Sequence, residues 1–446
     1  MKKYTFKFID LFAGLGGFHR ALESLGGKCV FASELKEDLQ KLYKINYPGT
    51  PIFGDITKIA PSDIPSFDIL CAGFPCQPFS QAGKRQGFND EKDRGNLFYY
   101  ICAILKEHTP RYVLLENVSN LMGHDNGNTW RVIKEELENL GYSVEARILS
   151  PHEFGIPQHR KRIYIVCQHN NFGGLDGFEF PEGKESDNCH ISTVIDENDT
   201  DVIQLKEETR NQLAVWQEFI DQTIAHGDSI PTFPVWAMEF GATYDYTDTC
   251  PAYQTLTSLK GKRGKLGSPI DGNTKEECIS QIPVYAQTDK DIVFPAWKIR
   301  YIQQNRAFYV KHKSWLDSWL TKVSDFDNSH LKFEWNCGKG ATPTITDKIV
   351  QFRASGIRVK LPTFSPALNL VGTQVPILPW IKIPGKDKIG RYMTLKEAAA
   401  IQGMRDINFK DETFSLPLSR CYEALGNAVN VDLVRLIAKA LITYGI

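Results

Sequence analysis

The sequence lacks several features, and each absence narrows the class of protein. No run of about 18 uncharged apolar residues occurs, so we expect no membrane-spanning helix. The first residues, MKKYTFKFIDLF, lack the apolar core and small-residue cleavage site of a signal peptide. Net charge is only −1, from 52 basic and 53 acidic residues, which excludes a uniformly basic chain but not one with a basic face.

The 10 cysteines include no C-x-x-C pair and no cysteine–histidine spacing typical of zinc sites, so we expect no structural metal. Several cysteines lie inside apolar runs. Without a secretory signal, they are expected to be reduced, buried thiols of a cytosolic protein.

The length of 446 residues indicates two or three domains. Through the first 170 residues, short apolar runs such as 67–73 and 112–117 alternate with segments of helical periodicity. Strands separated by helices predict an α/β fold with a doubly wound, mostly parallel sheet covered on both faces. In such sheets, ligands bind at the carboxyl ends of the strands. We therefore predict a catalytic and cofactor-binding domain over 1–180, completed by an amphipathic segment, 415–446.

The middle of the chain differs in character. Acidic residues dominate 181–229, which we interpret as a solvated connector with one helix near 205–224. Basic residues outnumber acidic ones over 230–370, and six of the eight tryptophans lie in 231–380. Basic residues interleaved with aromatics suggest a nucleic-acid surface, although aromatics also build the core of a second domain. We predict a second, irregular β-rich domain over 230–414.

A glycine-rich turn, Gly14-Leu15-Gly16-Gly17, follows the first apolar run and opens a helix, so a ligand can approach its backbone closely. Glu34, at the end of the second expected strand, is placed to bond ribose hydroxyls. Asp55 ends a third expected strand. Together these residues describe a nucleoside pocket; the competing interpretation is an ordinary strand–helix corner with solvated acids.

Cys76 lies between two prolines, just past the strand FDILCA, where an activated thiolate nucleophile would be exposed. Glu116 follows the strand YVLL at the same sheet edge. In a closed pocket its pKa would rise, making it a proton donor near neutral pH. Arg160 and Arg162 open the strand IYIV and can bind phosphate or a carbonyl oxygen.

In their order along the chain, these motifs resemble the DNA (cytosine-5)-methyltransferase family of the bacterial restriction–modification type. The resemblance covers 1–170 and 391–446, and the region between them matches in place and character only. The motifs that carry it are DLFAGLGG, Glu34, GDI, GFPCQPFS, ENV, QHRKR, the Arg391/Thr394/Glu397 to Gln402-Gly403 segment and GNAV.

The resemblance implies a Rossmann-like fold that binds S-adenosyl-L-methionine, without a metal, and a second domain that recognises the target. It implies that the Cys76 thiolate adds to C6 of a cytosine flipped out of duplex DNA. Glu116 would protonate N3, and Arg160 and Arg162 would bind the base carbonyl and a phosphate. By the same resemblance, the cofactor-binding residues are Phe12, Gly14, Leu15, Gly16, Glu34, Asp55, Ile56, Pro75, Leu97, Asn427 and Ala428.

Double-stranded DNA is the expected macromolecular partner, and a restriction endonuclease is the expected functional partner. We expect a monomer in the bacterial cytoplasm, associated with the nucleoid through DNA. The expected DNA-binding residues lie in the loop after Cys76 and in the basic segment KGKRGKLGS: Gln77, Ser80, Lys84, Arg85, Lys260, Lys262 and Arg263.

Other interpretations stay open for some residues and for the substrate. Leu15, Ile56 and Leu97 suit packing, Asn427 suits a helix cap, and Thr394 with Glu397 suits a capping box. Amino-methylating DNA enzymes carry a Pro-Pro loop, which this sequence lacks. An RNA cytosine methyltransferase of the same fold and a DNA-binding paralogue without catalysis are the remaining competitors.

Overall fold

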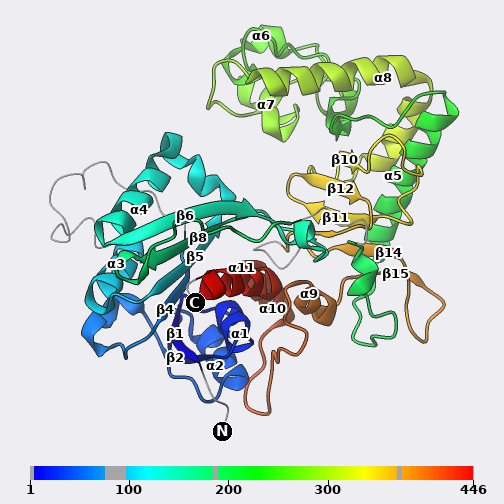
Figure 1. Cartoon of the computed structure of the whole chain (residues 1–446). Coiled ribbons are helices and arrows are strands. Elements are labelled where there is room, and N and C mark those ends of the chain that lie inside the picture. The colour runs from blue at the N-terminus through cyan, green and yellow to red at the C-terminus, as the bar shows by residue number, and fades with distance from the viewer. Residues whose placement is uncertain (1–4, 76–96, 184–188, 369–373, 445–446) are drawn as a thin grey trace. The chain divides into compact units, whose positions relative to one another are not determined.

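The computed structural model describes residues 5–75, 97–183, 189–368 and 374–444. The chain divides into two compact units (Figure 1). Unit 1 comprises Met1–Asp196, Thr363–Thr373 and Thr394–Ile446, and unit 2 comprises Glu197–Pro362 and Gln374–Met393.

Unit 1 is built on a seven-stranded sheet in the order β3-β2-β1-β4-β5-β8-β6. Its strands β3, β2, β1, β4 and β5 are parallel, whereas β8 runs antiparallel to both β5 and β6. The strands are β1 (Phe6–Leu11), β2 (Gly27–Ser33), β3 (Ile52–Phe53), β4 (Ile69–Gly73), β5 (Tyr112–Val118), β6 (Tyr142–Leu149) and β8 (Arg162–His169). The predicted mostly parallel α/β sheet is confirmed.

Alternating side chains of β1 show why helices cover both faces of this sheet. Ile9 and Leu11 lie in the same buried cluster as Phe98 and Ile101 of α3 (Leu97–His108). Phe8 points to the other face, where its ring packs edge-on against His19 of α1. The unit 1 helices around the sheet are α1 (Gly17–Glu23), α2 (Glu37–Asn46), α3, and α4 (Asn128–Asn139).

The end of the chain adds three helices to unit 1: α9 (Leu395–Ile401), α10 (Leu418–Asn427) and α11 (Val431–Tyr444). Helix α11 packs against α1. The predicted capping box is confirmed, because the Thr394 hydroxyl accepts from the Glu397 amide at 3.3 Å and the Glu397 carboxylate accepts from the Thr394 amide at 2.8 Å. This segment belongs to unit 1. The C-terminal part of the chain that completes unit 1 therefore begins at Thr394 and not at the expected residue 415.

Unit 2 packs two long helices, α5 (Glu207–Ala225) and α8 (Ala296–Val323), against one face of a six-stranded sheet. Its strand order is β15-β14-β11-β12-β10-β9. Trp216 of α5 stacks on Phe333 of β10 at 4.7 Å between ring centroids. The strands are β9 (Val235–Trp236), β10 (Lys332–Asn336), β11 (Ile349–Arg353), β12 (Gly356–Lys360), β14 (Ile377–Lys382) and β15 (Ile389–Tyr392).

The segment 181–229 is not the solvated connector that its charge suggested. Its helix forms where expected, but Trp216, Phe219 and Ile220 are fully buried in the unit 2 core. The acidic residues occupy the outer side of α5 and its apolar residues form a buried stripe on the other side. The overall charge of the segment does not reveal this arrangement. Shorter elements are α6 (Leu256–Leu259) and α7 (Lys275–Ser280) in unit 2, and the paired strands β7 (Gln158–His159) and β13 (Ser365–Pro366) in unit 1.

All nine cysteines within the described residues are free and buried, as expected from their apolar surroundings. Burial raises the thiol pKa of most of them, for example to about 11 for Cys421 and about 12 for Cys337. None of the described helices is both long and apolar enough to cross a membrane. Across the same residues, no group of three or more His, Cys, Asp or Glu side chains is arranged to hold a metal ion.

Candidate active site

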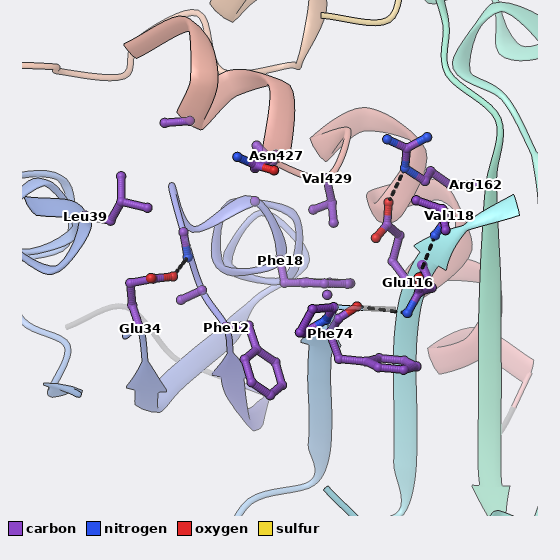
Figure 2. Close-up of a pocket in the computed structure, with 18 of the residues that line it drawn as sticks. Phe12, Phe18, Glu34, Leu39, Phe74, Glu116, Val118, Arg162, Asn427 and Val429 are labelled. Carbon is purple, nitrogen blue, oxygen red and sulfur yellow. Dashed lines mark hydrogen bonds and ion pairs between the residues drawn. The ribbon is translucent and has the colours of Figure 1, made fainter. Parts of the chain in front are cut away.

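A cavity of about 430 Å³ lies at the carboxyl ends of β1, β2, β4 and β5 in unit 1 (Figure 2). After β1 the chain continues to β2 on one side, and after β4 it continues to β5 on the other side. The connections therefore diverge between β1 and β4, and doubly wound sheets have their ligand crevice at such a point. Nine of the residues predicted from the sequence line this cavity: Phe12, Gly14, Glu34, Pro75, Glu116, Arg160, Arg162, Asn427 and Ala428.

The glycine-rich turn and Glu34 are joined directly. The backbone amide of Gly14 donates to Glu34 Oε2 and that of Lys36 donates to Oε1, each at 2.9 Å. Phe12 and Gly14 both adopt positive φ, so the chain turns sharply out of β1. A Cβ added at Gly14 would meet nothing nearer than the Phe12 carbonyl oxygen at 4.0 Å, so the missing side chain leaves space beside the cavity.

Glu116 and Arg162 form an ion pair at the opposite side of the cavity. Arg162 Nε lies 3.1 Å from Glu116 Oε1, as Figure 2 shows. Burial raises the pKa of Glu116 above its ordinary value, although Arg160 and Arg162 oppose that shift. A carboxyl with a raised pKa beside a cavity is suited to hold and release a proton near neutral pH.

Arg160 is buried beside this pair and is held by backbone contacts. Its Nη1 donates to the Gly426 carbonyl at 2.8 Å, and its backbone amide donates to the Ser150 hydroxyl oxygen at 2.9 Å. Burial and the neighbouring Arg162 lower its pKa to about 10. Among the described residues, its Nε is buried without a hydrogen-bond partner, so this donor is available to an anion or carbonyl in the cavity.

The strand-end residue Asn117 holds the segment that leads toward Cys76. Its side-chain amide donates to the Phe74 carbonyl at 2.8 Å, and its Oδ1 accepts from the Val118 amide at 2.8 Å. Pro75, the next residue, lines the cavity. Cys76 and the predicted DNA-binding residues Gln77, Ser80, Lys84 and Arg85 lie outside the described residues.

The remaining predicted cofactor residues do not line the cavity. Leu15 is buried. The Tyr47 hydroxyl contacts the glycine-rich turn, at 3.0 Å from the Leu15 carbonyl oxygen and 3.2 Å from that of Gly16. Asp55 turns its carboxylate to Thr57, whose hydroxyl and amide donate to it. Ile56 is buried and Leu97 is half-buried, both against the core below α3.

Sequence reasoning gave no role to several residues that line the cavity. Phe18 and Leu39 are apolar helix residues, and helical periodicity alone cannot separate a cavity wall from a core. Val429 belongs to the GNAV motif and Asn117 to the ENV motif. Both motifs were recognised in the sequence, but no role was predicted for these two residues. The full additional set is Ala13, Gly17, Phe18, Lys36, Leu39, Gly73, Phe74, Asn117, Val118, Ala424 and Val429.

In unit 2, the three predicted DNA-binding residues of the basic segment 260–268 have local partners. Lys260 Nζ lies 3.8 Å from Asp271, and Lys262 Nζ lies 3.3 Å from Asp245. Arg263 donates from Nη1 to the Gly267 carbonyl at 3.3 Å. Lys260 and Lys262 therefore each pair with an aspartate at the surface, where ion pairs contribute little to stability.

Comparison with known proteins shows which family the chain resembles. A sequence profile of the C-5 cytosine-specific DNA methylase family matches residues 6–443. The chain is 42% identical over 217 residues to the type II methyltransferase M.HhaI of Haemophilus parahaemolyticus, covering 49% of this chain and 64% of that protein. It is 50% identical over 203 residues to M.HaeII of Haemophilus aegyptius, covering 45% and 59%.

The match to these two relatives therefore spans about three fifths of their length. Over nearly the whole chain, 97% of it, the sequence is 29% identical to the type II methyltransferase M.AluI of Cellulosimicrobium cellulans, of which it covers 91%. Because the profile spans both units and every motif that lines the cavity, the chain belongs to the C-5 cytosine-specific DNA methylase family.

Proposed function

We propose that this protein is a DNA (cytosine-5-)-methyltransferase that methylates C5 of a cytosine within a specific duplex DNA sequence. The observation that carries the proposal is one cavity that joins the Gly14–Glu34 turn to the Glu116–Arg162 pair and is also lined by Pro75, the residue before Cys76 in the sequence. A nucleoside-binding half and a proton-donating half in one cavity are what methyl transfer to a base requires.

The residues present fit S-adenosyl-L-methionine. The cavity has the size of a small-molecule site, and Glu34 presents a carboxylate at 8% exposure beside an open glycine turn. Each carboxylate oxygen already accepts one amide and has a further lone pair for a ribose hydroxyl. Phe12, Gly14, Pro75, Asn427 and Ala428 would hold the rest of the molecule. When bound, S-adenosyl-L-methionine supplies a sulfonium methyl group to the activated C5.

Cys76 is proposed as the nucleophile. Its thiolate forms a bond to C6 of cytosine, and the electron pair of the C5–C6 double bond moves toward C5. After methylation, C5 loses its proton to water, the C5–C6 double bond re-forms, the Cys76 sulfur leaves as the thiolate, and N3 returns its proton to Glu116. The nine described cysteines support this assignment because all of them are buried away from any substrate.

Glu116 would donate a proton to N3 of the cytosine, which offsets the charge that develops on the ring during attack. Its raised pKa keeps it protonated at higher pH than an exposed glutamate. Arg162 holds its carboxyl in position, and the free Nε of Arg160 would donate to the base carbonyl. These atoms cannot reach a stacked base, so the cytosine would be flipped out of the duplex.

Unit 2 would recognise the DNA sequence, and the restriction–modification relatives support a protective role beside an endonuclease. The test is incubation of the purified protein with labelled S-adenosyl-L-methionine and either duplex DNA or tRNA, followed by mapping of methylated cytosines. We expect 5-methylcytosine at one duplex sequence. A duplex with 5-fluorocytosine at that site should become covalently attached to the wild type and not to C76A. Methylation of tRNA alone would contradict the proposal.

A further inference from the structure

One face of strands β10 and β12 in unit 2 is apolar, and the opposite face of these strands carries several cations. Phe333 of β10 and Val359 of β12 point to the core beneath α5, and both are fully buried. Because side chains alternate along a strand, Lys332, Arg358 and Lys360 lie on the opposite face. Arg353, Arg358 and Lys360 all belong to the segment FRASGIRVK, residues 352–360.

One glutamate serves two arginines at the centre of this face. Glu334 of β10 lies directly opposite Arg358 of β12 in the sheet register. Arg358 Nη2 lies 3.0 Å from Glu334 Oε2, and Arg353 Nη2 of β11 lies 2.9 Å from Oε1. A single carboxylate can neutralise only one of the two cations, so the cluster keeps a net positive charge.

Two lysines extend the positive charge along an aromatic edge. Lys332 Nζ lies 5.4 Å from the Trp236 ring centroid and 5.5 Å from that of Tyr285. Lys298, near the start of α8, lies 5.6 Å from the same Tyr285 ring. The aromatic faces attract these cations through the ring quadrupole but do not neutralise their charge, so both ammonium groups can still attract an anion.

The charges on this face repel one another. Burial and neighbouring Arg358 lower the pKa of Lys360 to about 8, and burial together with Lys298 lowers the pKa of Lys332. Arg353 also has a lowered pKa, from burial and from Arg358, although Glu334 opposes the shift. An anion bound here would relieve this repulsion.

We propose that the face made by Lys298, Lys332, Arg353, Arg358 and Lys360 binds the phosphate backbone of duplex DNA. The inference rests on the proposed function and names the surface that unit 2 uses. It differs from the sequence prediction, which placed DNA contacts in the segment 260–268, where Lys260 and Lys262 each have their own aspartate. Charge complementarity selects the occupant, because regularly spaced phosphates match a row of cations across adjacent strands.

The experiment measures the affinity of the full-length protein for a random-sequence duplex at several salt concentrations by fluorescence anisotropy. The logarithm of the association constant should fall linearly with the logarithm of salt concentration, and each lost phosphate contact should reduce that slope by about 0.9. R358Q, K360Q and K298Q should each weaken binding and flatten the slope, whereas R358K should retain it. K322Q is the matched control, since Lys322 is an exposed unit 2 lysine paired with Glu218 at 2.6 Å.

Glu334→Gln gives an effect of opposite sign. Removing this acid should tighten DNA binding several-fold if the face contacts phosphates, whereas a purely structural cluster would show no gain. Since K298Q leaves the Glu334 bridge intact, it tests the proposal even if the arginine variants fail to fold, which far-ultraviolet circular dichroism would reveal. Unchanged slopes in K298Q and R358Q, or tighter binding of tRNA than of duplex DNA, would overturn the proposal.

Binding to a random duplex does not depend on methyl transfer, so the two proposals fail separately. A protein that binds DNA through this face but transfers no methyl group would retain this inference and lose the proposed function. A protein that methylates DNA at wild-type rate and affinity when these cations are removed would do the reverse.

Discussion

The side-chain amide of Asn117 donates to the backbone carbonyl of Phe74 at 2.8 Å, joining the end of β5 to the segment two residues before Cys76. Asn117 is only 3% exposed, so this bond is shielded from water. The neighbouring Glu116 belongs to the same strand end. One strand therefore positions both the proposed proton donor and the approach to the proposed nucleophile.

Asn117→Ala should reduce methyl transfer much more than cofactor binding. It leaves the buried Phe74 carbonyl without its donor, which costs roughly 1–3 kcal/mol of stability. A displacement of Cys76 by about 1 Å would lower the rate by about 100-fold. Single-turnover methylation and equilibrium binding of S-adenosyl-L-methionine would separate the two effects. Asn117→Asp keeps the acceptor for Val118 but cannot donate, so it should show the same rate defect; a normal rate would exclude the anchoring role.

Gly16→Ala should weaken cofactor binding through Tyr47. Gly16 has φ +74°, and a Cβ built there would lie 2.4 Å from Tyr47 Cε2. The left-handed backbone costs about 1–2 kcal/mol for a non-glycine residue, and the clash would push the turn or the ring away. Because the same turn carries Gly14, we expect at least tenfold weaker binding of S-adenosyl-L-methionine, measured by isothermal titration calorimetry.

The matched control for Gly16 is Gly49→Ala, where an added Cβ would meet no atom within 4 Å. It should bind the cofactor normally. Tyr47→Phe removes the hydroxyl that contacts the Leu15 and Gly16 carbonyls, a bond worth about 1 kcal/mol, and should weaken binding by a smaller factor. Equal affinity in Gly16→Ala and Gly49→Ala would show that the turn does not depend on this packing.

The native protein should contain a single rapidly reacting thiol. Nine of the 10 cysteines are buried, and burial suppresses the thiolate form. Titration with Ellman's reagent should therefore release about one equivalent of thionitrobenzoate quickly in the native wild type and ten after denaturation. C76A should lose the fast phase. A fast phase that survives in C76A would assign the reactive thiol to another cysteine.

The raised pKa of Glu116 should appear in the pH dependence of stability. A carboxyl whose pKa is higher in the folded state binds a proton more tightly when folded, so its contribution to the free energy of unfolding falls as pH rises from its ordinary value near 4.5 through the raised folded value. Above that range the contribution is constant. The difference in unfolding free energy between wild type and Glu116→Gln should therefore change over that window and level off above it.

Urea denaturation of both proteins at a series of pH values would give this difference, in which the other titrating groups cancel. In parallel, kcat/KM for methylation should fall in the wild type as Glu116 ionises. Glu116→Gln can hydrogen-bond but not transfer a proton, and should be slow at every pH. A stability difference independent of pH would mean that Glu116 titrates normally.

Much of the secondary structure of unit 1 can be predicted from short stretches of sequence. Apolar runs predict the buried parallel strands because such strands must be hydrophobic on both faces, and the Thr394–Glu397 spacing predicts a capping box because both bonds form within one turn. The chemistry proposed for Cys76, Glu116 and Arg162 was predicted from residue type and from their expected places at strand ends. Family membership follows from the order of these motifs, which does not depend on how the chain packs.

Only the tertiary structure decided which distant residues meet. The Arg160–Gly426 bond joins positions 266 residues apart, and Tyr47 contacts Gly16 although two helices and a strand separate them along the chain. The many acidic residues of 181–229 led to the prediction of a solvated connector, yet Trp216 is buried in the unit 2 core. Burial depends on which side of a helix packs against another element. Likewise, strand register alone brings Arg353 and Arg358 to one glutamate, and composition cannot encode register.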